Sequence, residues 1–174
     1  MRSHFWLATT LVMACFLVGC GGGGGGNDSE RTPVATTCDS GDLWAARPAA
    51  SGSAIPDNNT TGVSVTWDNQ NCTLQSIATA TLDICLSHPQ PTDLVWTITT
   101  PDSSVPLTLT APTDWNTTGS LCDTGQGKLQ RFNLLPQLTP NTTTRGIWRL
   151  QVSDRLAGTA GTLIQWRVLA QGLN

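Results

Sequence analysis

The sequence predicts an all-β protein, an antiparallel β-sandwich that follows an export signal and a flexible linker. Residues with high helix propensity are scarce in the 174-residue chain, which has one Lys and one Glu, whereas Thr, Gly and Pro are plentiful. Several short segments alternate apolar and polar side chains with a period of two, and turn residues separate them. No sustained helical period follows the signal, so we expect no long helix after it. The alternating segments and the turns between them predict about eight short strands.

The first 19 residues are the expected export signal. Arg2 and His4 precede an apolar run at 5–18, which has the length of a signal-peptide core and is shorter than the ~20 residues that span a bilayer. The run ends in Leu17-Val18-Gly19-Cys20, which resembles the lipobox of bacterial lipoproteins. The resemblance implies lipidation of Cys20, and Gly21 after it implies sorting to the outer membrane of a Gram-negative envelope. The alternative is an ordinary secretory signal with a free Cys20.

Residues 20–48 are expected to be a linker, and residues 49–174 the folded domain. An uninterrupted glycine tract occupies 21–26, and polar residues continue to about 37. Chains of this composition behave as random coils. A disulfide at Cys38 would tether the end of the linker to the domain, so the mobile part is expected before that residue.

Four further cysteines predict two disulfides, because an exported chain with an even number of cysteines forms bridges in an oxidising compartment. No C-x-x-C spacing occurs among them, so zinc and thioredoxin-like chemistry are not supported. Three pairings stay open from the sequence. The candidates are Cys38, Cys72, Cys85 and Cys122.

The predicted strands follow one another from residue 63 to the end of the chain. Alternation is clear at 63–67, 80–86, 94–98, 107–109, 147–152 and 163–169, and is less regular at 129–135. Residues 111–127 are turn-rich and predict a long loop that carries Trp115 and Cys122. The apolar faces predict the core, which contains Val63, Val65, Trp67, Ala80, Leu82, Ile84, Leu86, Leu94, Trp96, Ile98, Trp148, Leu150, Val152, Ile164, Trp166 and Val168.

An ordered set of short motifs spans roughly residues 50–170. The set consists of Ile55-Pro56-Asp57 with Gly62, 84–88 (ICLSH) with Asp93-Leu94, 100–103 (TPDS) with Leu107, 146–154 (GIWRLQVSD), Gly158, and 161–166 (GTLIQW). In order and spacing it resembles the P domain, or P/Homo B domain, of kexin- and furin-like proprotein convertases and of many bacterial proteases. Thr92, Pro89 and Ser103-Ser104 depart from the family pattern at turns.

The resemblance implies an eight-stranded jelly-roll sandwich and a structural role for the matching residues. In multidomain relatives the P domain packs on a subtilisin-like catalytic domain and stabilises it. The catalytic domain is absent from this sequence, so we expect a non-catalytic interaction module whose link to serine endopeptidases and proteolysis is through a partner chain. The residues carried over as scaffold are Asp57, His88, Asp93, Pro101, Gly146, Trp148, Asp154, Gly161 and Trp166.

The residues give little support for catalysis, and no catalytic residue is assigned. A Ser/His/Asp relay needs a histidine base, and His88 is the only histidine after the signal. We expect His88 to be hydrogen-bonded near the Asp93 turn, with a cryptic hydrolase as the alternative. The net charge is −3, so the chain does not have the excess of basic residues that is typical of nucleic-acid-binding proteins.

No cofactor is expected, although calcium is an alternative because oxygen ligands from aspartates at turns suffice for it. Those aspartates also cap turns through their own backbone, which is the simpler interpretation. The calcium candidates are Asp57, Asp93, Asp102 and Asp154.

Tryptophans outside the predicted strands suggest a second function from another class. Trp115 in the long loop and Trp44 before the domain are candidates for exposed indoles that stack on sugars. The alternative hypothesis is therefore a surface adhesin or glycan-binding jelly roll that uses Trp115.

Overall fold

The computed structural model describes residues 32–45, 52–110, 122, 127–139 and 142–174. These belong to one compact unit, Thr32–Asn174. The expected signal, Cys20, the glycine tract and Trp115 lie outside the described residues. No helix in the described part of the chain is long and apolar enough to cross a membrane.

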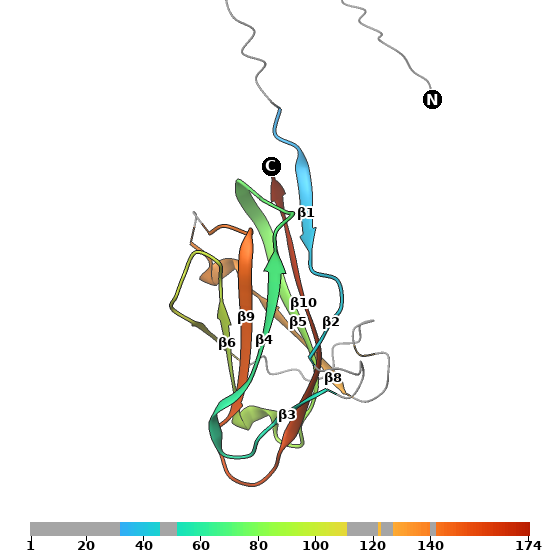
Figure 1. The fold of residues 1–174 in the computed structure, drawn as a ribbon, viewed down its shortest axis with the longest axis vertical. Coiled ribbons are helices and arrows are strands. Elements are labelled where there is room, and N and C mark those ends of the chain that lie inside the picture. The colour runs from blue at the N-terminus through green and yellow to red at the C-terminus, as the bar shows by residue number, and fades with distance from the viewer. Residues whose placement is uncertain (1–31, 46–51, 111–121, 123–126, 140–141) are drawn as a thin grey trace, which may run out of the picture. The chain divides into compact units, whose positions relative to one another are not determined.

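The described residues form two antiparallel sheets that face each other (Figure 1). In the first sheet the order is β1-β10-β5-β8, and β2 and β3 also pair with β10. The second sheet has the order β4-β9-β6-β7. The strands are β1 (Ala35–Asp39), β2 (Leu43–Trp44), β3 (Ser53–Ile55), β4 (Asn59–Asn69), β5 (Ser76–Ser87), β6 (Leu94–Thr99), β7 (Leu107–Leu109), β8 (Lys128–Asn133), β9 (Gly146–Asp154) and β10 (Gly161–Leu173), with 3₁₀ turns η1 (Pro91–Asp93) and η3 (Leu135–Gln137).

The connectivity of the described strands is that of a jelly roll. Strands β1, β2 and β3 are successive pieces along one side of β10, so together they fill one position. With that position counted first, the sheets read 1-8-3-6 and 2-7-4-5, the arrangement in which the chain repeatedly crosses between the layers. The predicted all-β antiparallel sandwich is confirmed.

The compact unit begins earlier than the expected boundary at residue 49. Strand β1 pairs with the end of β10, from Ala35 opposite Leu173 to Asp39 opposite Leu169. The segment is polar and has no apolar alternation, so its sequence pattern did not indicate a strand. Backbone pairing with β10 and the one buried side chain, Cys38, hold it on the sheet.

The core lies between the two sheets and is built around three tryptophans. Trp96, Trp148 and Trp166 are fully buried, as the alternation predicted. Trp67 is half-buried on edge strand β4 and lies against Trp148, with ring centroids 6.4 Å apart. Phe132 of β8 packs on Trp96 at 5.5 Å, which joins the two layers.

The expectation that Ile164 shares a face with Trp166 and Val168 is wrong. An irregularity in the β10–β5 register between Leu163 and Gln165 shifts the alternation by one residue. Leu163 and Trp166 therefore both join the main core. Ile164 packs instead with Cys85 and Leu129 in a second, smaller cluster. Because Cys85 alternates with Ile84 and Leu86 along β5, this cluster lies on the outer face of the first sheet.

Two disulfides select one of the three open pairings. Cys38 of β1 is bonded to Cys72, which follows β4, and Cys85 of β5 is bonded to Cys122. The first bridge links β1 of the first sheet to the segment that follows β4 of the second sheet. The expected tether at Cys38 is therefore confirmed. The second bridge closes the outer cluster, where Cys122 packs beside Ile164.

Substitution of two glycines, Gly62 and Gly41, distinguishes the cost of backbone strain from the cost of steric overlap. Both have positive φ, +58° and +63°. A Cβ on Gly62 would lie 2.0 Å from the Val152 carbonyl oxygen, whereas one on Gly41 meets no atom within 4 Å. We expect Gly41→Ala to lower the free energy of unfolding by about 1 kcal/mol and Gly62→Ala by about 2–4 kcal/mol. Urea denaturation measures both, and equal losses would contradict the close approach of Gly62 in β4 to Val152 in β9.

Candidate functional site

The largest concentration of predicted motif residues lies at one end of the sandwich. Three connections meet there: the turn after β3, the segment between β5 and β6, and the loop between β9 and β10. His88 directly follows β5, and Asp154 ends β9, 66 residues later in the chain. We refer to this region as the His88 end.

His88 and Asp154 form a buried pair at the His88 end. The His88 Nε2 atom lies 3.1 Å from Asp154 Oδ2, and both side chains have 0% exposure. The backbone N–H of Gln90 donates to His88 Nδ1 at 3.1 Å. Because Nδ1 accepts this hydrogen bond, the ring proton is on Nε2, which donates to the Asp154 carboxylate.

Further contacts connect the three segments of the His88 end. The other Asp154 oxygen, Oδ1, accepts from the backbone N–H of Leu156 at 3.0 Å. The Arg155 N–H donates to the Asp93 carbonyl at 3.3 Å. Asp57 Oδ1 accepts from the Gly158 N–H at 2.9 Å. One buried imidazole and two aspartates thus hold the loops in fixed relation.

Gly161 provides the space that the imidazole needs. A Cβ at this position would lie 2.4 Å from His88 Cδ2 and 2.8 Å from the Ser87 carbonyl oxygen. At the opposite end of β9, Gly146 has φ +122°, and a Cβ there would lie 2.8 Å from Pro101 Cβ. These two motif glycines are therefore positions of close approach between neighbouring segments.

The geometry makes His88 unsuitable as a general base. Both ring nitrogens are engaged, and the ring has no exposed surface. A base must reach the proton of a nucleophile or a substrate. The expectation placed His88 in a hydrogen bond near the Asp93 turn. In the structure its side chain is bonded to Asp154 and to the Gln90 N–H. The Asp93 turn is linked to the residue after Asp154 by the bond from the Arg155 N–H.

The four calcium candidates are not gathered into one site. Asp57, Asp93 and Asp154 lie at the His88 end, each engaged in a turn or in the buried pair. Asp102 is exposed in the turn between β6 and β7. Among the described residues no group of three or more His, Cys, Asp or Glu side chains is placed to hold a metal ion.

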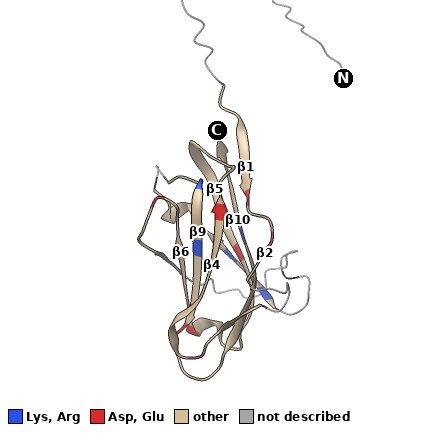
Figure 2. Ribbon diagram, in the orientation of Figure 1, with Lys and Arg blue, Asp and Glu red and all other residues tan. Residues whose placement is uncertain are grey.

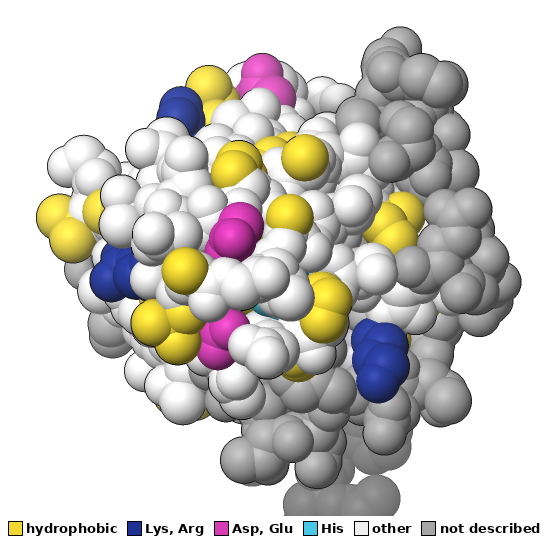
Figure 3. Space-filling model, turned by 90° about the horizontal axis from the view of Figure 1, so that it is seen from below, with side chains coloured by type: hydrophobic (Ala, Val, Ile, Leu, Met, Phe, Trp, Pro, Cys, Tyr) yellow, Lys and Arg dark blue, Asp and Glu magenta, His cyan; other side chains and the backbone are white. Residues whose placement is uncertain are grey.

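The surface of the His88 end is apolar around its acidic groups. Leu156 is 58% exposed, and Pro56 and Pro89 are exposed on the neighbouring segments. Figure 3, which views the domain from this end, shows hydrophobic side chains interspersed with acidic ones.

A second polar network, which the sequence did not reveal, lies at the other end of the domain. The buried Asn69 side chain donates to the carbonyls of Cys72 at 2.9 Å and Thr144 at 2.6 Å. Thr144 Oγ1 donates to the Cys72 carbonyl and accepts from the Leu74 N–H. Trp148 Nε1 donates to the Thr144 carbonyl at 2.9 Å. These contacts hold the Cys72 backbone in place, and with it the Cys38–Cys72 disulfide, which packs with the core.

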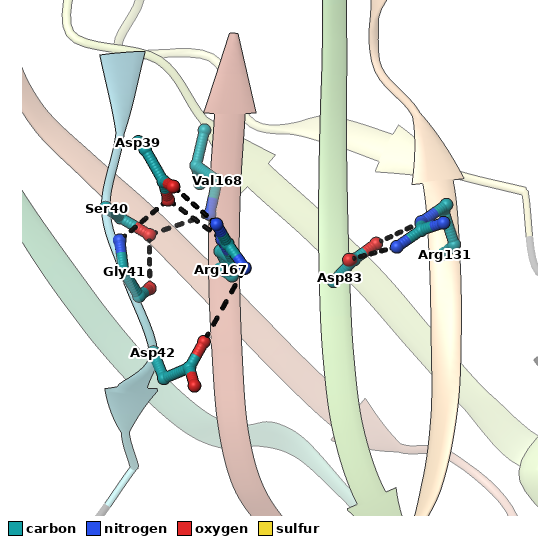
Figure 4. A network of polar contacts seen from close by, with 8 residues as sticks. All are labelled: Asp39, Ser40, Gly41, Asp42, Asp83, Arg131, Arg167 and Val168. Atoms are coloured by element: carbon teal, nitrogen blue, oxygen red, sulfur yellow. Dashed lines mark hydrogen bonds and ion pairs between the residues drawn. The ribbon is translucent and has the colours of Figure 1, made fainter. Parts of the chain in front are cut away.

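Few positions along the ribbon are charged residues (Figure 2). Several of those in the first sheet form a row across its outer face. Figure 4 shows Arg167 of β10 with Asp39 and Asp42 on one side, and Asp83 with Arg131 on the other. Arg131 binds both oxygens of Asp83 at 2.6 Å. Register places Arg167 opposite Asp83 and Asp83 opposite Arg131, so signs alternate along the row.

Hydrogen bonds in this row shift the titration of its members. The hydrogen bond from Arg167 holds the pKa of Asp39 below its ordinary value of 3.8. The same bond raises the pKa of Arg167, and the bond to Asp83 raises the pKa of Arg131. Asp83, Arg131 and Arg167 occupy polar positions of predicted strands, whereas Asp39 and Asp42 lie in the expected linker, and only the strand register brings them together.

Comparison with known proteins gives a fold likeness. No protein-family profile matches the chain, and no curated protein sequence matches it. The structure of the Aeromonas sobria serine protease (ASP) and chaperone (ORF2) complex is similar, with a TM-score of 0.57, 18% identity, and coverage of 82% of this chain and 28% of that chain. The structure of the serine protease of Aeromonas sobria is also similar, with a TM-score of 0.54, 17% identity, and coverage of 83% of this chain and 28% of that chain.

The likeness covers most of this chain but little more than a quarter of the matched chains. At this level of identity it shows a shared fold. The second structure is described as the protease alone, so the jelly roll resembles one part of a serine protease chain.

Removal of the His88 ring should destabilise the domain strongly. His88→Ala leaves the buried Asp154 Oδ2 without its donor, which costs about 1–3 kcal/mol or more because the acceptor is a carboxylate. His88→Gln retains an N–H donor and is expected to lose less. Unfolding in urea at pH 7 measures the difference, and a loss below 1 kcal/mol for His88→Ala would contradict the buried pair.

The Asp39–Arg167 pair should contribute pH-dependent stability. The pKa of Asp39 is lowered by folding, so its contribution is fully present above the unfolded value of 3.8 and disappears as the pH falls through the lower folded value. Because both side chains are partly exposed, Asp39→Asn should cost no more than about 1 kcal/mol at pH 7. Asp102→Asn, an exposed carboxylate outside the row, is the control for the lost charge. A larger effect of Asp39→Asn at pH 3 than at pH 7 would contradict the assignment.

Proposed function

We propose that the chain is a lipid-anchored, non-catalytic P domain of a Gram-negative envelope that docks on an exported subtilisin-like serine protease supplied by another chain and stabilises it. The observation that carries this proposal is the likeness of this domain to about 28% of a serine protease chain. A module that forms one part of a protease in one protein is well suited to bind a protease from outside in another.

The positions of the motif residues support the P-domain assignment beyond the shared fold. Gly62 lies against Val152, and Gly161 lies against His88, in both cases closer than a Cβ permits. His88 and Asp154 form the buried pair that joins two motifs. The ordered motifs therefore coincide with the contacts that hold the strand ends together, as expected for a shared scaffold.

The state of His88 supports a non-catalytic role. Its two nitrogens are bonded to Gln90 and Asp154 within the domain, so the histidine stabilises the loops instead of activating a nucleophile. The function is then one of binding, and binding requires an accessible surface.

The His88 end is the surface that best suits docking. The buried pair fixes its loops, so their exposed apolar side chains are presented without a large loss of conformational entropy on binding. Leu156 is the most exposed large apolar side chain of this end. The exposed apolar side chains of this end are interspersed with acidic ones and with Arg155, a mixture that suits a protein interface.

A crosslinking pull-down from the envelope of the source organism tests the proposal. The full chain with its own anchor is the bait, and mass spectrometry identifies the captured protein. We expect one dominant subtilisin-like serine protease, whose residual activity after heating is several-fold higher when the chain is present. Recovery of polysaccharide, or of no specific protein, would contradict the proposal and favour the glycan-binding alternative.

Two variants, one just after the end of β9 and one at its start, test which surface binds the protease. Leu156→Glu is expected to abolish capture and protection of the protease. Ile147→Glu is the matched control, because Ile147 is 55% exposed and lies at the start of β9, away from the His88 end. Equal losses in both variants would contradict docking through the His88 end.

A further inference from the structure

The four edges of the two sheets differ in their protection against pairing with another chain. Unpaired N–H and C=O groups on an edge strand form a template for a further strand, and native proteins block it with charges, proline, short strands or bulges. Edge strand β8 carries Lys128 and Arg131, and edge strand β7 has three residues and follows Pro106. The edge formed by β1, β2 and β3 is divided into three short pieces.

Edge strand β4 lacks most of these devices. It has 11 residues, and its only charged residue is Asp68, close to its end. Among the described strands, β4 pairs only with β9. The irregularity between Asn59 and Val63 disturbs its first residues, and from Val63 to Asn69 the register with β9 is continuous. This stretch is rich in residues with high β-propensity and contains no proline.

We propose that β4 pairs antiparallel with β4 of a second copy of the chain, about a two-fold axis at Val65. In this register Val63 lies opposite Trp67 of the partner subunit, and Ser64 lies opposite Thr66 of the partner subunit. Pairs of aromatic and β-branched residues, and of hydroxyl residues, stabilise antiparallel strands. Asp68 lies opposite Gly62 of the partner subunit, so the like charges are kept apart.

The two-fold axis also preserves the faces of the sheet. Residues opposite each other differ by an even number, so the Val63, Val65 and Trp67 row continues the core side across the interface. The exposed Ser64 and Thr66 stay on the outer side. The product is a continuous sheet of eight strands, four from each copy, which is within the ordinary size of sheets.

Self-pairing at β4 is independent of docking at the His88 end. The β4 edge runs along the side of the second sheet, whereas the protease proposal uses the loops that contain Leu156. Loss of one activity therefore does not imply loss of the other.

Sedimentation equilibrium of the full chain tests the dimer, with Cys20→Ser as background so that an anchor does not form micelles. We expect twice the mass of one chain at 10–100 µM. Ser64→Lys with Thr66→Lys places lysines opposite lysines at the interface and should give a monomer. Thr108→Lys with Thr110→Lys has the same spacing on exposed positions of the other edge and should remain a dimer. Unchanged thermal unfolding confirms that each variant is folded.

A crosslink tests the register. Val65→Cys is expected to form a disulfide between two copies when oxidised glutathione is the oxidant, and Thr108→Cys is expected not to. A monomeric wild-type chain, or a dimer that survives the lysines on β4, would overturn the proposal. Failure of Val65→Cys to crosslink in a dimer would overturn the proposed register.

Discussion

Strand β10 is the pairing surface on which the domain depends. One side of it pairs with β5 from Thr162 to Leu173, and the other side receives β3, β2 and β1 in turn. Through β1 it holds the Cys38–Cys72 disulfide, and at its start Gly161 admits the His88 ring. Both ends of the sandwich are therefore positioned by one 13-residue strand.

The buried His88–Asp154 pair fixes the loops at one end of this framework. The pair lies between the ends of β5 and β9, which belong to different sheets, and it fixes the loops that leave them. The same contacts that make the loops rigid occupy both nitrogens of the imidazole. In this domain the histidine–aspartate contact therefore has a structural role, and it fixes the loops that carry the exposed Leu156, Pro56 and Pro89.

The sequence predicted those features that depend on local patterns, and left open those that depend on pairing. Alternation identified the core faces of β4, β5, β6 and β9 because a half-buried strand repeats every two residues. It misplaced Ile164, since a bulge changes the phase without leaving a local signal. Strand β1 was missed because it has no apolar alternation and is held by backbone pairing with β10 and by the Cys38–Cys72 disulfide. The partner of His88 lies 66 residues away, and the disulfide pairing likewise requires the assembled sheets.

We propose that the chain itself is not a peptidase and acts through a protease partner. Labelling with a fluorophosphonate probe, which reacts with activated serines, tests this claim directly on the crosslinked complex. We expect that the captured partner is labelled and that this chain is not, alone or in the complex. Stoichiometric labelling of a serine in this chain, abolished by heat denaturation, would contradict it.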